Sequence, residues 1–209
     1  MTATQTRILS IDDPNAISFA LSALEADDLI VFPTDTLYGL AGRINEISLQ
    51  KIYAAKQRPE EKAIPVLVGD MEQLEQLAST VKPAVVALMK AYWPGPLTLV
   101  VPKNPELPAS LTPYPGVAVR MPDHPFALKL LLQTGPLAVT SANISGGQNP
   151  TTAEEVYAQL NGRVALILDG GKHPGGKAST IIDCQGDSPQ VLREGPIDLE
   201  EILKVWRQE

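Results

Sequence analysis

The sequence predicts an α/β fold, in which one twisted, mixed parallel and antiparallel sheet is flanked by helices. Short apolar runs of strand length alternate along the chain with patterns of helical period. No internal repeat and no low-complexity linker interrupts this alternation. The 209 residues also suit one large domain with an ample core. We therefore expect residues 1–209 to form a single domain.

The first expected elements are a helix and a buried strand. Asp13 followed by Pro14 is typical of a helix start, and the apolar face that follows predicts a helix ending near Ala26. Residues 29–32 are apolar and partly β-branched, which predicts a strand. Residues 34–42, rich in hydroxyl groups at their start, are expected to form a loop at the strand end, where open α/β sheets hold their ligands.

The second helix carries a cation on its inward face. Asn45 is a suitable N-cap, and Lys56 lies seven residues after Leu49 on the apolar stripe. Arg58 precedes Pro59, which disfavours helical geometry and is expected to end the helix. A cation on that stripe must reach solvent or meet an anion. The alternative is an exposed Lys and Arg pair at a helix C-terminus, favoured there by the macrodipole.

The remaining elements continue the alternation. Strands are expected at residues 64–68, 97–101, 117–120, 137–140, 164–168 and 179–183, with a further run leading to Arg193. Helices are expected to begin at Asp70, Pro83, Asp123, Thr152 and Asp198. The proline-rich residues 102–116 predict a long irregular connection, and such connections in compact domains are often functional covers.

Composition and charge exclude several classes of protein. The formal net charge of -7 argues against a protein that coats nucleic acid by electrostatic attraction. The single cysteine, Cys184, excludes an intramolecular disulfide and a cysteine-rich metal site, and its apolar neighbours predict a buried thiol. No apolar segment of signal-peptide or membrane-spanning length is present in the sequence. We expect a cytoplasmic protein with no membrane partner.

The sequence nearly matches one known catalytic motif and lacks two others. Residues 171–177 nearly match a phosphate-binding P-loop, but Ala178 occupies the required Ser or Thr position and a strand is expected to follow. There is no Gly-x-Ser-x-Gly motif and no paired-histidine metal motif. The two histidines, His124 and His173, are expected at a helix start and in a loop. An enzyme built on this sequence would therefore act by positioning and electrostatics.

Polar side chains recur at the ends of the expected strands. They are Thr34, Lys56, Arg58, Arg120, Ser141, Asn143, Ser179 and Arg193. Cations beside hydroxyl groups suit a substrate with a carboxylate and phosphates, because charge-assisted hydrogen bonds to oxyanions are strong. Each cluster taken alone also fits an ordinary capped turn.

Six motifs resemble those of the YrdC-type threonylcarbamoyl-AMP synthase family and occur in that family's order. They are PTDTLYGL at residues 33–40, KQRP at 56–59, WPGPLT at 93–98, VAVRMP at 117–122, SAN at 141–143 and STII at 179–182. The resemblance covers about residues 14–200, and its Lys-x-Arg and Ser-x-Asn elements are the most specific. It implies a YrdC-like fold.

The resemblance also implies an activity and a set of roles. The implied enzyme is a nucleotidyltransferase that converts L-threonine, bicarbonate and ATP into L-threonylcarbamoyladenylate and pyrophosphate. Threonine would be held by Thr34, Arg120 and Ser179, with Arg120 pairing the carboxylate. ATP would be held by Lys56, Arg58, Lys62, Ser141, Asn143, Asn149 and Arg193, of which Lys56, Arg58, Ser141 and Asn143 form the catalytic set. The product would serve a separate tRNA threonylcarbamoyl-transferase, which modifies the adenosine beside the anticodon.

The implied chemistry needs no protein nucleophile. A carbamate formed from threonine attacks the α-phosphate, which requires in-line positioning and neutralised phosphate charge. Mg²⁺ is expected to be held through the phosphates, and no protein metal site is expected. The sequence departs from the family at Asp35, where many members have glutamate, and at Leu67, where some have histidine.

Two other functions compete with this hypothesis. One is a double-stranded RNA-binding module without synthase activity, which should show a basic face and strong salt dependence. The other is the carbamoyl-adenylate chemistry of larger hydrogenase-maturation proteins, which carry additional domains. A weak contact between a synthase and tRNA or double-stranded RNA is a separate expectation.

Overall fold

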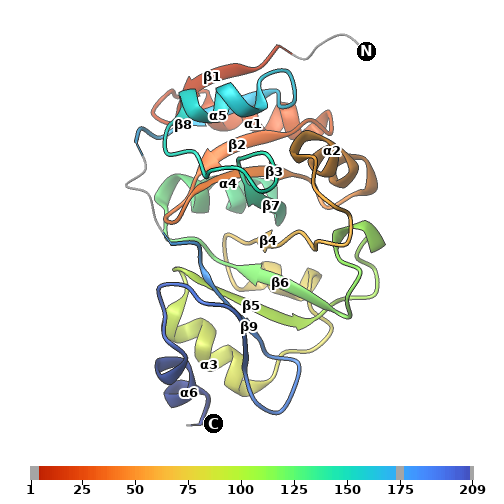
Figure 1. Ribbon diagram of the computed structural model, residues 1–209, viewed down its shortest axis with the longest axis vertical. Helices are drawn as coiled ribbons and strands as arrows, with labels where there is room; N and C mark the ends of the chain where they lie inside the picture. Colours follow the sequence, from red (N-terminus) through yellow and green to blue (C-terminus); the bar gives the residue numbers. More distant parts are fainter. Residues whose placement is uncertain (1–4, 173–176, 208–209) are drawn as a thin grey trace.

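Ten strands pair into one twisted sheet in the computed structural model, which describes residues 5–172 and 177–207 (Figure 1). The strands are β1 (Arg7–Ser10), β2 (Ile30–Pro33), β3 (Tyr38–Gly42), β4 (Val66–Leu67), β5 (Leu97–Pro102), β6 (Gly116–Arg120), β7 (Leu137–Ser141), β8 (Leu166–Asp169), β9 (Thr180–Asp183) and β10 (Gln190–Arg193). Their order across the sheet is β1-β8-β2-β3-β7-β4-β6-β5-β9-β10. Parallel pairs such as β5 with β9 adjoin antiparallel pairs such as β5 with β6, so the mixed sheet is confirmed.

Helices cover the sheet through two apolar clusters. The α-helices are α1 (Ala16–Glu25), α2 (Glu46–Lys56), α3 (Pro83–Tyr92), α4 (Pro125–Thr134), α5 (Ala153–Leu160) and α6 (Leu199–Trp206), and η1 (Glu72–Gln76) and η2 (Ala109–Leu111) are short 3₁₀ helices. Along β2, Val31 belongs to one cluster, whereas Ile30 and Phe32 belong to the other. This strand is therefore buried on both faces, as its continuous apolar run predicts. Helices α3 and α6 lie together near β5 and β9 (Figure 1).

Two strands were not predicted from the sequence. Only residues 34–37 of the expected loop 34–42 form a turn, because β3 pairs antiparallel with both β2 and β7. Gly39 lies within β3 because the packing there leaves no room for a side chain. A β carbon at Gly39 would lie 2.8 Å from Cγ1 of Val139 on β7. The other missed strand, β1, is a four-residue edge strand that pairs only with β8.

Most predicted helix starts are confirmed. Asn45 and Thr152 cap α2 and α5 through their side chains, and Nδ1 of His124 accepts a hydrogen bond from the N–H of Ala127 at 3.4 Å. The first helix, however, begins at Ala16 rather than at Pro14. The carboxylate of Asp13 accepts from the N–H of Asn15 at 2.8 Å and forms a turn before the helix.

Two further expectations concern the C-terminal third. Strand β9 follows Ala178, which confirms that no P-loop helix opens there, while His173 lies outside the described residues. The Cys184 thiol is buried, as predicted, and burial raises its pKa to about 12. Within the described ranges, we find no helix that is both long and apolar enough to cross a bilayer.

Candidate active site

A cavity of about 810 Å³ extends over one face of β5, β6 and β9. Alternate residues of each strand line it, as the two-residue period of a strand requires. They are Thr98 and Val100 from β5, Gly116, Ala118 and Arg120 from β6, and Ser179, Ile181 and Asp183 at and along β9. The intervening residues Leu99, Val119 and Ile182 instead join the apolar cluster that contains α3 residues. These three strands therefore form a continuous cavity wall.

The rest of the cavity wall comes from segments distant in the sequence. Thr34, Thr36 and Leu37 precede β3, Arg58 follows α2, Pro65 and Leu67 lie at β4, and Ser141 ends β7. Asn149 and Arg193 also line the cavity. Most of the polar strand ends predicted from the sequence are thus brought together around one space.

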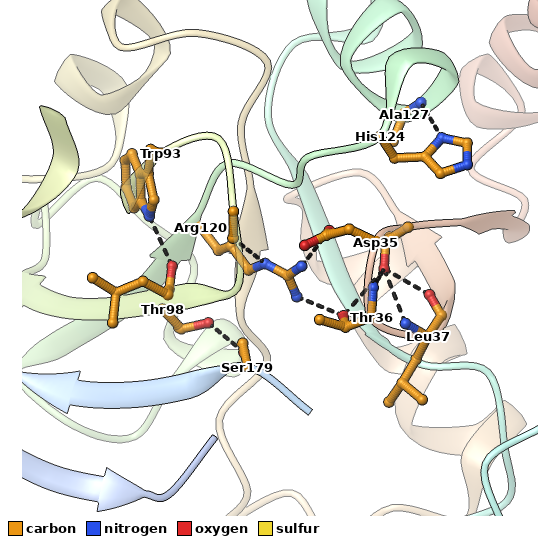
Figure 2. Close-up of polar contacts among 12 residues, drawn as sticks. Asp35, Thr36, Leu37, Trp93, Thr98, Arg120, His124, Ala127 and Ser179 are labelled. Atoms are coloured by element: carbon orange, nitrogen blue, oxygen red, sulfur yellow. Dashed lines mark hydrogen bonds and ion pairs between the residues drawn. The ribbon is translucent and has the colours of Figure 1, made fainter. Parts of the chain in front are cut away.

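Arg120 is buried at one end of the cavity, with 6% of its surface exposed. Its guanidinium donates to the carbonyl of Gly95 at 3.0 Å, to Oγ1 of Thr36 at 2.7 Å and to the carboxylate of Asp35. Figure 2 shows this guanidinium pointing toward Asp35 and Thr36. Burial lowers the pKa of Arg120, and the Asp35 carboxylate opposes that shift. The three hydrogen bonds hold the guanidinium in one orientation.

Removal of the Asp35 carboxylate is expected to destabilise the fold. In Asp35→Ala the buried Arg120 guanidinium loses its counter-charge, which costs about 3 kcal/mol of unfolding free energy. Urea denaturation measures this loss. The matched control is Asp28→Ala, which breaks a partly exposed ion pair with Lys51 and should cost less than about 1 kcal/mol. Equal, small losses in both variants would contradict a structural role for the buried pair.

Ser179 and Arg193 form a second polar group beside Arg120. Oγ of Ser179 lies 2.8 Å from Oγ1 of Thr98, and this pair is drawn in Figure 2. Nη2 of Arg193 donates to Oγ of Ser179 at 3.0 Å, and Nε donates to the Ser179 carbonyl at 3.0 Å. The cation of β10 is therefore tied to the start of β9 and faces the cavity with Ser179.

Lys56 lies behind the cavity wall and does not line the cavity. It is 1% exposed, and its Nζ donates to the carbonyls of Ser141 and Asn143 at 2.5 Å each and to Oδ1 of Asn143 at 3.3 Å. Burial, reinforced by the nearby charge of Arg58, lowers the pKa of Lys56 to about 7. The inward orientation predicted from the helical stripe is confirmed, and the contacts hold the end of β7.

Asn143 is equally internal. Its Oδ1 accepts from Oγ of Ser141 at 2.5 Å, while its Nδ2 donates to the carbonyls of Ile144 and Gly147 at 2.9 and 2.8 Å. These bonds close the glycine-containing loop that follows β7. Lys56 and Asn143 together therefore fix the position at which Ser141 faces the cavity.

Arg58 does reach the cavity, but Lys62 does not line it. Nη2 of Arg58 donates to the carbonyl of Ala63 at 2.8 Å, and Nε donates to that of Lys62 at 3.2 Å. Gln57, between Lys56 and Arg58, adopts a left-handed conformation with φ of 52° and is exposed. The helix end thus directs the two cations of the Lys-x-Arg motif to different places.

Comparison with known sequences decides the family. The Sua5_yciO_yrdC family model, described as Telomere recombination, matches residues 22–195. The chain belongs to this family.

Individual relatives of the Sua5/YciO/YrdC family agree. A threonylcarbamoyl-AMP synthase of Bacillus subtilis is 43% identical over 94% of this chain and 58% of the relative. A putative threonylcarbamoyl-AMP synthase of Mycobacterium tuberculosis is 41% identical over 89% of this chain and 87% of the relative. The crystal structure of P. abyssi Sua5 complexed with L-threonine has a TM-score of 0.88 at 39% identity, over 96% of this chain and 60% of that one.

These comparisons confirm the resemblance and the YrdC-like fold. The chain spans a little more than half the length of the Bacillus subtilis relative. The names of these Sua5/YciO/YrdC relatives favour the synthase hypothesis over a double-stranded RNA-binding module. Contact with RNA stays a prediction.

Several residues around the cavity were not assigned a role from the sequence. Thr36 and Thr98 contact Arg120 and Ser179, and both stand inside quoted family motifs, so the motifs offered a clue. Asp183 could have been found by continuing the alternation from Ser179 along β9. Gln185 follows the strand and carried no comparable pattern. Among the described residues, no group of three or more His, Cys, Asp and Glu side chains is placed to hold a metal ion.

Proposed function

We propose that the protein is a threonylcarbamoyl-AMP synthase, which forms L-threonylcarbamoyladenylate and pyrophosphate from L-threonine, bicarbonate and ATP. One observation carries the proposal: a buried, pre-oriented arginine and two further arginines line the same cavity as Thr34 and Ser179. Such a set suits one ligand with a carboxylate and another with phosphates. The names of the relatives support the same reaction.

Threonine would occupy the end of the cavity formed by Thr34, Arg120 and Ser179. Arg120 has five N–H groups, and three of them donate to the described partners, so two are available for a carboxylate. Ser179 offers a hydroxyl just before β9, which lies beyond β5 from Arg120, and Thr98 and Arg193 already orient this hydroxyl. The amine of threonine would then point toward the phosphate-binding part of the cavity.

ATP would lie beside threonine and contact Arg58, Ser141, Asn149 and Arg193. All four line the cavity. Lys56 and Asn143 would act as positioning residues, because their bonds hold the Ser141 loop from behind. Lys62 contributes its carbonyl to the orientation of Arg58, and a direct contact of its ammonium group with ATP is the weakest of the expected contacts.

The reaction would proceed by positioning. The amine of threonine adds to carbon dioxide derived from bicarbonate, with loss of a proton, and gives a carbamate. A carbamate oxygen then attacks the α-phosphorus, forming a P–O bond as the bond to the pyrophosphate leaving group breaks. Arginines preorganised around the phosphates stabilise the developing charge. Mg²⁺ would enter bound to the ATP phosphates, as expected for a cation that keeps several of its waters and binds with substrate phosphates.

Pyrophosphate release tests this function. The pure protein is incubated with L-threonine, bicarbonate, Mg²⁺ and ATP, and each substrate is omitted in turn. We expect release to require both threonine and bicarbonate. The product would be passed to a separate tRNA threonylcarbamoyl-transferase, which is assayed with unmodified tRNA. Folded protein that binds neither ATP nor threonine would overturn the proposal.

Ser141→Ala is expected to lower pyrophosphate release by at least about tenfold. The change removes a hydroxyl that faces the cavity and also its bond to Asn143, and one hydrogen bond to a charged group accounts for a loss of that size. Steady-state rates at varied ATP measure the effect. Ser22→Ala, on the exposed side of α1, is the matched control and should keep full activity. An unchanged rate in Ser141→Ala would remove Ser141 from the site.

A further inference from the structure

The part of the cavity away from Arg120 contains a polar pair that the proposed reaction does not use. Asp183, at the end of β9, and Gln185, just after it, both line the cavity. Asp183 lies four positions after Ser179, which corresponds to about 13 Å at roughly 3.3 Å per residue of strand. Small or apolar side chains, Ala118 and Ile181 among them, line the wall between these two ends.

The pair has one fixed and one available oxygen. Oδ1 of Asp183 accepts from the backbone N–H of Gln185 at 3.0 Å and from its Nε2 at 3.1 Å. Within the described residues, Oδ2 of Asp183 accepts no hydrogen bond. Nε2 of Gln185 has a second N–H group beyond the one used by Asp183. An acceptor and a donor therefore stand side by side at this end of the cavity.

The fold holds this pair in place from two sides. Nζ of Lys82 donates to the carbonyls of Gln185 and Gly186 at 3.1 and 2.6 Å and anchors the turn. Gly116 provides the space under the Gln185 side chain, because a β carbon there would lie 2.8 Å from Nε2 and 2.9 Å from Cδ of Gln185. The pair is thus preorganised against the cavity wall.

Two large and exposed side chains also line the cavity. Tyr114 and Leu192 line the cavity and expose 57% and 59% of their surface. Together with the small residues Gly116 and Ala118, they give this part of the cavity an apolar lining. A planar ring with polar atoms at its edge matches such a surface, because stacking covers the apolar side chains.

We propose that Asp183 and Gln185 recognise the base of ATP, with Oδ2 of Asp183 accepting from the exocyclic amino group and Nε2 of Gln185 donating to N7, which is an acceptor in both adenine and hypoxanthine. The proposal rests on the proposed function, which places ATP in this cavity. It adds a specificity-determining pair about 13 Å from the threonine end. A neighbouring donor and acceptor is the edge pattern that amide side chains use to read adenine.

Asp183→Asn provides a test with a defined direction. The two N–H groups of Gln185 should retain the amide oxygen of the new side chain at the place of Oδ1, so its NH₂ group replaces Oδ2. A donor then meets the amino group of adenine, whereas the 6-oxo group of ITP accepts from that donor. We expect the preference for ATP over ITP to fall by about 10- to 100-fold.

The preference is measured in two ways on the full chain. Calorimetric titration with ATP and with ITP gives binding without turnover, and pyrophosphate release with each nucleotide gives activity. Asp187→Asn, an exposed change in the same turn, is the matched control and should keep the wild-type ratio. Gln185→Leu is a second variant and is expected to weaken ATP binding by about tenfold.

The outcomes separate this proposal from the proposed function. An ATP to ITP ratio that is unchanged in Asp183→Asn, in protein that binds both nucleotides, would overturn base recognition by this pair. Wild-type protein that binds ATP but releases no pyrophosphate with threonine would overturn the synthase while leaving the base test intact. Wild-type protein that binds neither nucleotide would overturn both.

Discussion

Arg120→Lys is expected to lower kcat/KM for L-threonine by about 10²- to 10³-fold. The guanidinium donates to Gly95, Thr36 and Asp35 at once, and this leaves two N–H groups in a fixed direction for the substrate carboxylate. A lysine ammonium is a single point charge on a flexible stem and cannot keep these bonds together. The loss corresponds to two charge-assisted hydrogen bonds at the low end of their range.

Pyrophosphate release at varied threonine and saturating ATP measures this effect. Binding of ATP in the absence of threonine should change far less, because Arg120 lies at the other end of the proposed arrangement. Arg43→Lys, at an exposed position after β3, is the matched control. An Arg120→Lys enzyme with wild-type kcat/KM for threonine, or one that loses ATP binding in equal measure, would contradict the assignment.

Lys56→Met is expected to change how stability depends on pH. The pKa of Lys56 is lowered to about 7 by burial, whereas lysine in the unfolded chain ionises near 10.5. Between these values the unfolded state binds more protons than the native state, so the contribution of Lys56 to stability rises with pH. Above pH 7, the unfolding free energy of wild type relative to Lys56→Met should rise by up to about 1.4 kcal/mol per pH unit.

Urea denaturation at intervals from pH 6 to 9 provides the measurement. The difference between wild type and variant removes contributions common to both, including those of Tyr38 and Cys184, whose pKa values burial raises. Lys90→Met removes an exposed lysine in the last turn of α3 and is the matched control. A pH-independent difference for Lys56→Met would mean that its three oxygen partners keep the ammonium group charged in the native state.

The sequence predicted most of the fold because its elements carry strong local patterns. Pro83 starts α3 as expected, and Thr152 caps α5 as expected. Strand β3 escaped prediction because its two glycines resemble turn residues, and tertiary contacts explain them: Gly39 packs on Val139 of β7, and Gly42 packs on Leu29 and on Ser48 of α2. Tertiary packing decided that element, and no local pattern records tertiary packing.

The site was predicted in its residue types and less well in their arrangement. Helical periodicity correctly placed Lys56 inward, but only the structure shows that it holds carbonyl groups behind the cavity wall. Arg58, two residues further along the chain and beyond the end of α2, faces the cavity instead. Whether a side chain lines a cavity or lies behind its wall depends on how segments far apart in the sequence pack against one another. Spacing in the sequence does not contain that information.

Strand β4 is only two residues long, and this affects how the two halves of the sheet are joined. The two residues of β4, Val66 and Leu67, pair with both β7 and β6, and one backbone bond from each flanking residue, Pro65 and Val68, adds to this short junction between the two halves of the sheet. The side chain of Arg120 on β6 bonds to Asp35 and Thr36 before β3, and these contacts also join the two halves of the sheet. A ligand held by Thr34 on one side and Ser179 on the other would add a further crosslink. Under the proposed function, substrate binding would therefore add to the contacts that join the two halves of the sheet.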